Sequence, residues 1–119
     1  MALYDRLPVY KACYDLLLDV YRLSGQMSKD HRYTLGENAK KTCTEIIILI
    51  YRANTNVKKY AYLKQAKEKV EVIRLLMRIY KDLNQIGVER FVAVSEQIEN
   101  ISKQINAWAK LYEHEEERK

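Results

Sequence analysis

The near absence of helix-breaking residues constrains this chain more than any other feature. Its 119 residues include three glycines and a single proline, which stands at position 8. Proline removes a backbone hydrogen-bond donor and clashes with the preceding turn, so it is the residue that most reliably ends a helix. No such residue follows position 8, and the hydrophobic content of 48% is that of a globular domain. We therefore predict an all-α fold, an antiparallel up-down-up-down four-helix bundle.

Apolar residues recur at three- and four-residue steps in four segments, as expected when each helix buries one stripe. The four stripes are Cys13, Leu16, Val20, Leu23 and Met27; Leu35, Ala39, Cys43, Ile46, Ile50 and Ala53; Leu63, Ala66, Val70, Ile73, Met77 and Tyr80; and Phe91, Val94, Ile98, Ile101, Ile105, Trp108 and Tyr112. The first helix begins at Leu7-Pro8, because proline suits the first helical position. Gly87 separates the last two helices.

Two connections can be predicted in more detail. The polar segment 28–33 is expected to be a loop, and Thr34 with Glu37 matches a capping box that opens the second helix. The chain as a whole, 1–119, is expected to be one domain, with the bundle over 7–112 and an acidic tail over 113–119.

The first two helices carry more apolar surface than one bundle needs. A second stripe lies to the side of each core stripe, and leaving it in water would expose a patch that monomers rarely tolerate. Tyrosine is also enriched at interfaces. We therefore expect a homo-oligomer interface at Tyr10, Tyr14, Tyr21, Ile47, Ile48 and Tyr51. The alternative is a wide core face with the tyrosines at its edge.

Positive charge is concentrated in the middle of the chain. Residues 34–86 hold eleven Lys and Arg against five Asp and Glu, while the net charge of the whole chain is +5. Basic side chains at helical spacing can meet successive phosphates or a partner's carboxylates. The expected nucleic-acid or partner-binding residues are Lys41, Arg52, Lys67, Arg74, Arg78 and Lys81. Loop residues Lys58, Lys59 and Lys64, interleaved with Tyr60 and Tyr62, could stack on bases. The alternative is a solvated charged face.

The sequence offers little for catalysis. His31 and His114 are isolated, and no carboxylate–histidine spacing typical of a metal site occurs. Cys13 and Cys43 fall on core stripes, so we expect two buried thiols in a reducing cytoplasm, and the alternative is a disulfide between them. No apolar run approaches the length of a membrane span, about 18 residues. We predict a cytoplasmic protein that is not an enzyme and needs no cofactor.

Several of these segments together resemble a known family. They are Leu7-Pro8-Val9-Tyr10-Lys11, Tyr33-Thr34-Leu35-Gly36-Glu37, Ile50-Tyr51-Arg52-Ala53-Asn54, Glu71-Val72-Ile73-Arg74-Leu75-Leu76 and the fourth helix from Ile98 to Trp108. Their order and spacing are similar to Avd, the accessory variability proteins of diversity-generating retroelements. The likeness covers roughly residues 7–112. The wider superfamily holds the S23-like proteins of 23S rRNA intervening sequences, whose Glu-Gly late in helix two is missing here at Arg52-Ala53-Asn54.

The resemblance implies a homopentamer of four-helix protomers. It also implies binding to the element's reverse transcriptase and to RNA or DNA, in support of mutagenic copying, without catalysis. An rRNA-associated bundle of the intervening-sequence kind and a structural oligomer without a nucleic-acid role stay open as alternatives.

Overall fold

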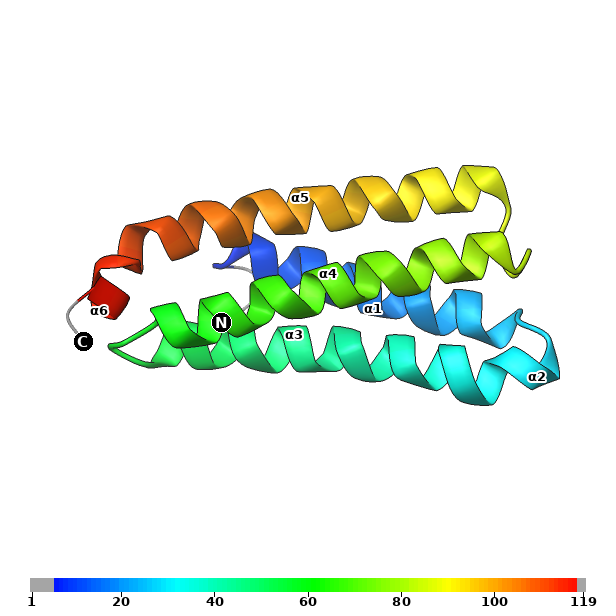
Figure 1. Ribbon diagram of the computed structural model, residues 1–119, viewed down its shortest axis with the longest axis horizontal. Coiled ribbons are helices and arrows are strands. Elements are labelled where there is room, and N and C mark those ends of the chain that lie inside the picture. Colours follow the sequence, from blue (N-terminus) through cyan, green and yellow to red (C-terminus); the bar gives the residue numbers. More distant parts are fainter. Residues whose placement is uncertain (1–5, 118–119) are drawn as a thin grey trace.

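The computed structural model describes residues 6–117, which form helices and turns with no strand (Figure 1). In chain order the elements are α1 (Pro8–Gly25), α2 (Lys29–His31), the π-helical turn η2 (Arg32–Gly36), α3 (Glu37–Thr55), α4 (Tyr60–Asp82), α5 (Val88–Tyr112) and α6 (His114–Glu117). The predicted all-α class is confirmed. The molecule measures 47 × 33 × 23 Å along its principal axes.

The four long helices lie side by side and form a helical bundle around one core. Helices α3 and α5 each pack against both α1 and α4, so α1 and α4 lie diagonally across the core (Figure 1). The predicted stripes supply most of the buried side chains, and Ile73 and Ile101 are at most 1% exposed. Leu35, Phe91, Trp108 and Tyr112 are the partly exposed members of the stripes. The bundle prediction missed Val9, Leu49, Leu76 and Ala109, which are also buried.

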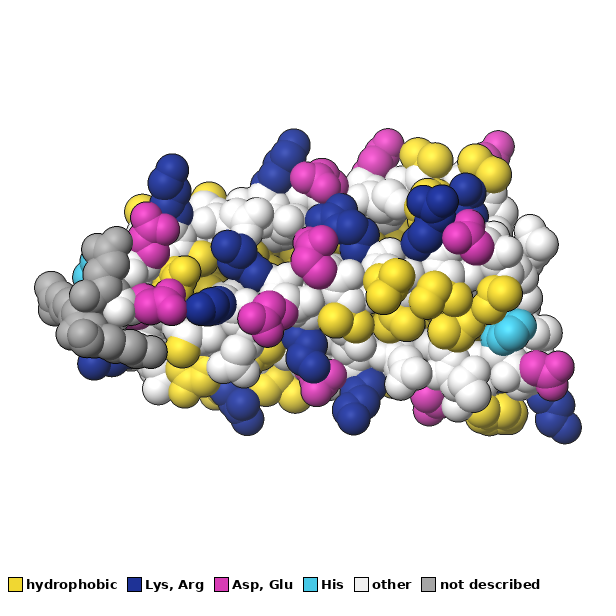
Figure 2. Space-filling view, in the orientation of Figure 1, with side chains coloured by type: hydrophobic (Ala, Val, Ile, Leu, Met, Phe, Trp, Pro, Cys, Tyr) yellow, Lys and Arg dark blue, Asp and Glu magenta, His cyan; other side chains and the backbone are white. Residues whose placement is uncertain are grey.

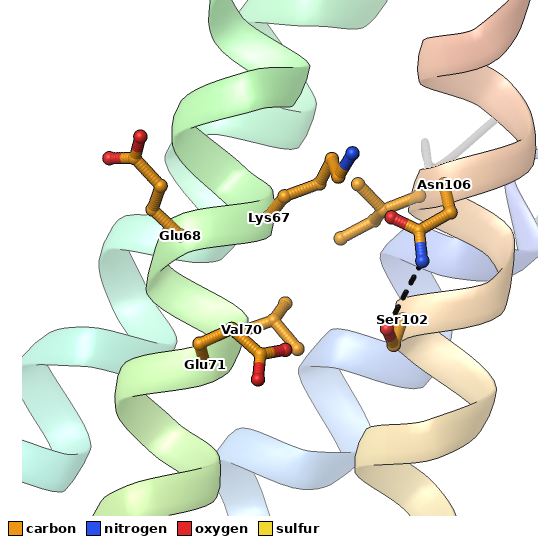
Figure 3. A pocket seen from close by; sticks show the side chains of 7 residues that line it. Lys67, Glu68, Val70, Glu71, Ser102 and Asn106 are labelled. Atoms are coloured by element: carbon orange, nitrogen blue, oxygen red, sulfur yellow. Dashed lines mark hydrogen bonds between the residues drawn. The ribbon is translucent and has the colours of Figure 1, made fainter.

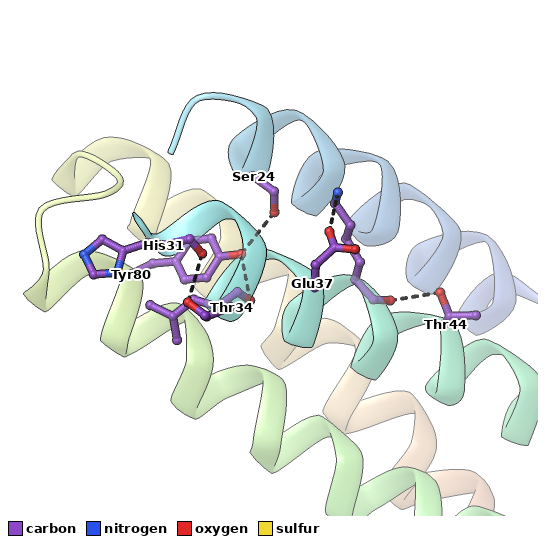
Figure 4. A network of polar contacts seen from close by, with 8 residues as sticks. Ser24, His31, Thr34, Glu37, Thr44 and Tyr80 are labelled. Carbon is purple, nitrogen blue, oxygen red and sulfur yellow. Dashed lines mark hydrogen bonds and ion pairs between the residues drawn. The ribbon is translucent and has the colours of Figure 1, made fainter. Parts of the chain in front are cut away.

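The connection between α1 and α3 differs from the prediction. Segment 28–33 is not a loop, because α2 starts at Lys29 and continues through η2 directly into α3. The capping box is also wrong. Thr34 lies inside η2, where its hydroxyl donates to the carbonyls of Asp30 and His31 at 3.4 Å, and the Glu37 carboxylate pairs with Lys40 at 2.9 Å (Figure 4). A helix that enters α3 from the preceding turn already satisfies the backbone groups that a cap serves.

Buried contacts hold this turn against the bundle. The Tyr80 hydroxyl lies 3.1 Å from Ser24 Oγ and donates to the Leu35 carbonyl at 3.5 Å (Figure 4). Gly36 packs so closely on α1 that an added Cβ would lie 3.3 Å from Ser24 Cβ. The Arg32 guanidinium donates to the carbonyls of Gly25 and Met27, at 3.1 and 3.2 Å, and so satisfies carbonyls at the end of α1.

The remaining connections are short. The segment predicted as a basic loop is partly helical, because α4 begins at Tyr60 and carries Tyr62 and Lys64 in its first turns. Between α4 and α5 the chain turns over residues 83–87, with Asn84 in the left-handed region at φ 58°. Asparagine tolerates that conformation better than most residues. The turn therefore depends on Asn84 as well as on the predicted Gly87.

Candidate protein and nucleic-acid interfaces

Four of the six predicted binding residues lie together along the seam between α4 and α5. Lys67 lines a hollow of about 380 Å³ whose α5 wall includes Ser102 and Asn106 (Figure 3). Arg74 and Arg78 line a second hollow of about 480 Å³, again between α4 and α5. The Lys81 ammonium lies 5.3 Å from the centre of the Phe91 ring, also on α5. The side of α4 that carries these four cations therefore faces α5.

Two of the four cations are already paired with carboxylates. Arg74 Nη1 lies 3.1 Å from Glu99 Oε2 on α5, and its Nε lies 3.3 Å from Glu71 Oε1. Arg78 Nε lies 3.2 Å from Asp82 Oδ1, one turn along α4. These pairs are largely exposed, so they are weak and can exchange for phosphates. Within residues 6–117, Lys67 and Lys81 are in no such ion pair.

The other two predicted residues, Lys41 and Arg52, belong to a different seam. Both are exposed on α3, and Glu45 lies between them on the same side of that helix. Glu45 Oε1 lies 3.4 Å from Lys69 Nζ on α4, which marks this side as the seam between α3 and α4. The six residues therefore do not form one patch. They flank α4 on its two sides, and Lys69, which the sequence analysis did not single out, adds a third cation to the α3 side.

The predicted oligomer residues do gather on one surface, which we call the α1/α3 face. It consists of Tyr10, Tyr14, Tyr21, Ile47, Ile48 and Tyr51. Tyr14, Tyr21, Ile48 and Tyr51 are 42–54% exposed, whereas Tyr10 and Ile47 are half-buried against the core. The Lys40 ammonium on α3 lies 4.7 Å from the centre of the Tyr21 ring on α1, so the two helices contribute to the same face.

A second apolar surface was missed by the sequence analysis. We call it the α4 face; it consists of Val72, Leu75, Ile79 and Leu83. Val72, Leu75 and Leu83 are 42%, 59% and 43% exposed, and Ile79 is half-buried. Figure 2 shows apolar side chains gathered over the half of α4 nearer to α2, while Lys, Arg, Asp and Glu side chains are scattered over much of the visible surface around them. The spacing of these residues, 72, 75, 79 and 83, was visible in the sequence.

At the end of the bundle away from α2, the chain after α5 folds back onto the start of α4. Glu115 Oε1 accepts hydrogen bonds from the backbone N–H groups of Lys59 and Tyr60, at 3.0 and 2.7 Å. These bonds, the one from Tyr60 foremost, hold the pKa of Glu115 below its ordinary value. Lys64 Nζ lies 3.0 Å from Glu116 Oε1. Part of the predicted acidic tail therefore covers the predicted basic-aromatic segment.

The cysteines are poor candidates for covalent chemistry. Cys13 and Cys43 are free and buried, as predicted. Burial raises the pKa of each thiol to about 12, so both are protonated at neutral pH, whereas the thiolate is the nucleophile. The described residues hold no cluster of His, Cys, Asp and Glu that could bind a metal ion. None of the helices in residues 6–117 has the length and apolar character to cross a membrane.

Comparison with known proteins agrees with the resemblance seen in the sequence. None of the curated proteins matches the chain. The model of the bAvd-like family, however, matches residues 8–112. This range begins at the first residue of α1 and ends at the last residue of α5. It contains the α1/α3 face, the α4 face and all six candidate binding residues. The chain therefore belongs to the bAvd-like family.

Proposed function

We propose that this protein is a non-catalytic accessory protein that assembles into a homo-oligomer and binds a reverse transcriptase together with RNA or DNA. The observation that carries the proposal is the family match over residues 8–112. The resemblance of the chain to the accessory variability proteins implies an adaptor role in mutagenic copying. Two surfaces of this chain suit such a role, the α1/α3 face and the cations on either side of α4.

The proposed protomer is an antiparallel up-down-up-down four-helix bundle. Short connections over 56–59 and 83–87 support this arrangement, because helices joined by a few residues pack as antiparallel neighbours. We place the protein in the cytoplasm, since a reverse transcriptase and its nucleic acid are there and both cysteines are free.

Assembly uses the α1/α3 face and gives five copies, the number that the resemblance to Avd implies. Four of its six side chains are more than 40% exposed, which is a large apolar surface for a monomer of this size. In a ring, each protomer repeats the same cations. Weak contacts at each copy then add through multivalency. A ring therefore binds a long nucleic acid more tightly than one protomer can.

Charge-removal pairs test the binding role. Arg74→Gln with Arg78→Gln removes two cations beside α5, and Lys41→Gln with Arg52→Gln removes two beside α3. Arg22→Gln with Lys29→Gln is the matched control, since both cations are exposed and lie on α1 and α2, outside these seams. Each pair removes the same charge. Binding of the element's RNA and of the reverse transcriptase is measured for each variant across a salt series, with helicity and oligomer mass checked in parallel.

We expect both seam pairs to weaken RNA binding and to lower the slope of log affinity against log salt by roughly 1 to 2. The control pair should bind nearly as the parent does. If both seam pairs bind like the parent, the cations are solvated surface charges and the structural-oligomer alternative gains.

A further inference from the structure

The start of α4 lies in a segment of the chain that carries positive charges and no negative ones. Residues 46–67 include five Lys and Arg and no Asp or Glu. Three of the five, Lys58, Lys59 and Lys64, belong to the predicted basic-aromatic segment, which the proposed function does not use. A segment of this kind attracts negative charge from another part of the chain or from a ligand.

In this structure the negative charge comes from α6, which lies at the end of the bundle where α4 begins (Figure 1). Glu115 Oε1 accepts hydrogen bonds from the backbone N–H groups of Lys59 and Tyr60, and Glu116 Oε1 lies 3.0 Å from Lys64 Nζ. Backbone N–H groups at the start of a helix and lysine ammonium groups also bind phosphate oxygens. Two neighbouring carboxylates of the chain therefore occupy donors that suit the backbone of a nucleic acid.

A hollow of about 400 Å³ lies between α6 and the start of α4. Lys58, Tyr60 and Lys64 line it on one side, and Glu115 and Glu116 line it on the other. An aromatic ring beside lysines suits a single strand of nucleic acid, because an unpaired base stacks on the ring while the phosphates meet the cations. In a duplex the bases are already paired and stacked, so a duplex can use the cations alone.

The contacts that hold α6 in this position are few and polar. The side chains of Lys64 and Glu116 are 52% and 43% exposed, and an ion pair so open to water contributes little stability. The helix itself has only four residues, His114–Glu117, and a helix of that length is not stable on its own. Detaching α6 from α4 therefore costs much less than unfolding the bundle.

The position of α6 also brings it close to the α4/α5 seam. Lys64 precedes Lys67 by three residues, so the two lysines are neighbours on α4. From Lys67 the seam continues to Arg74 and Arg78, which line the next hollow between α4 and α5. A strand bound along the seam holds its phosphates beside Glu116. The phosphates then compete with the carboxylates at a high local concentration.

We propose that α6 is an autoinhibitory strap, which keeps single-stranded nucleic acid off the start of α4 until the strand displaces Glu115 and Glu116. The proposal rests on the nucleic-acid binding proposed above and adds a covered contact that regulates it. The strap lies beyond Tyr112, where the match to the bAvd-like family ends. A strand must give up part of its binding free energy to displace the strap, so the strap weakens nucleic-acid binding.

Two matched charge pairs test the proposal. The strap pair, Glu115→Gln with Glu116→Gln, keeps the shape of both side chains and removes their charges. The control pair, Glu89→Gln with Glu96→Gln, removes the same charge from the side of α5 opposite to its buried residues. Both control residues are exposed, and neither takes part in an ion pair in the described part of the chain.

A third variant shows where any gain in binding arises. It combines the strap pair with Lys58→Gln and Lys64→Gln, which remove the cations that the strap covers. The affinity of each protein for a fluorescent oligothymidylate of about 20 nucleotides is measured by anisotropy across a salt series. Duplex DNA of the same length is measured alongside. Helicity and oligomer mass are checked for every variant.

We expect the strap pair to bind the oligothymidylate about three- to tenfold more tightly than the parent, the range for a few exposed charged contacts. The control pair should bind within about twofold of the parent, since its charges lie far from the hollow. The third variant should lose the gain, because the strap then has nothing to cover. The gain for duplex DNA should be smaller than the gain for the single strand.

Other results would overturn the proposal. If the parent binds the oligothymidylate and the strap pair binds it equally well, α6 only closes the end of the bundle, and the proposed function stands. A gain that the control pair shares, or that persists in the third variant, comes from net charge and not from the strap. An equal gain for duplex DNA would remove the preference for single strands. If neither the parent nor the strap pair binds nucleic acid, this inference and the proposed nucleic-acid binding both fail.

Discussion

The two ends of the molecule are closed by different kinds of contact. At the α2 end, Tyr80 is fully buried and its hydroxyl contacts Ser24 and the Leu35 carbonyl (Figure 4). Gly36 and Ser24 pack so closely there that a Cβ on Gly36 would lie 3.3 Å from Ser24 Cβ. These contacts are shielded from water, so neither salt nor moderate pH changes should weaken them.

At the α6 end, the contacts are polar and close to solvent. A small apolar cluster of Ala53, Leu63 and Ala109 is covered by half-buried aromatic rings, Trp108 among them. The end is then closed by Glu115, which accepts two backbone hydrogen bonds at the start of α4. Contacts of this kind contribute less to stability and depend on ionisation. One end of the bundle is therefore expected to be insensitive to pH and salt, and the other end to respond to both. Three predictions follow from this difference.

The largest expected effect is the loss of a whole aromatic side chain at each end. Tyr80→Ala should lower the free energy of unfolding by about 3–5 kcal/mol, the range for emptying a buried aromatic site. Trp108→Ala should cost clearly less, although the ring is larger, because Trp108 is half-buried. Urea unfolding followed by circular dichroism measures both. Equal losses would show that the two ends are packed equally well.

A smaller loss of stability is expected when only the buried hydroxyl of Tyr80 is removed. Tyr80→Phe keeps the ring but leaves Ser24 Oγ and the Leu35 carbonyl without this partner, which should cost about 1–3 kcal/mol. Tyr112→Phe at the α6 end is the matched control, and its cost should stay within about 0.5 kcal/mol, since that ring is half-buried. The urea midpoints of the two variants measure both losses of stability. A Tyr80→Phe variant as stable as the parent would mean that the hydroxyl contact contributes nothing net.

The sequence predicted the middle of the bundle better than its ends. Ile73 and Ile101 were correctly predicted to lie in the core. Buried positions along a helix repeat with the helical period, and the spacing of apolar residues in the sequence shows that period directly. Thr34 and Glu37 matched a capping motif, yet that motif describes only a few neighbouring residues. Tyr80, more than forty residues later in the chain, donates a hydrogen bond to the Leu35 carbonyl in this turn. A motif made of neighbouring residues cannot predict a contact with a residue so far along the chain.

In the candidate interfaces, too, contacts within one helix could be predicted from the sequence and contacts between helices could not. The Arg78–Asp82 pair follows from a four-residue spacing and could have been predicted, and so could the α4 face. The Arg74–Glu99 pair joins two helices, so it depends on how α4 and α5 are rotated against each other. In the same way, the packing of α3 against α4 decides that Lys41 and Arg52 lie on the other side of α4. Which residues share a side of one helix can be predicted, but which helices share a seam requires the structure.

The smallest expected effect is the pH response of the α6 end. Glu115→Gln removes the charge that receives the N–H groups of Lys59 and Tyr60, so at pH 7 the variant should have a lower melting temperature than the parent. Glu113→Gln removes the same charge outside this contact and should change the melting temperature less.

The sign of the pH dependence follows from the direction of the pKa shift. The hydrogen bonds from Tyr60 and Lys59 lower the pKa of Glu115 from its ordinary value of 4.5, so folding favours the carboxylate. The resulting stability is fully present above pH 4.5 and is lost as the pH falls through the lower folded-state pKa. Melting curves should therefore show the parent and Glu115→Gln separated at pH 7 and converging below pH 4.5. The separation between the parent and Tyr80→Phe should persist over the same range, because burial raises the pKa of the Tyr80 hydroxyl and keeps it protonated. If the Glu115→Gln separation does not shrink in acid, the contact stabilises through geometry rather than charge, and the two ends differ less than their structures indicate.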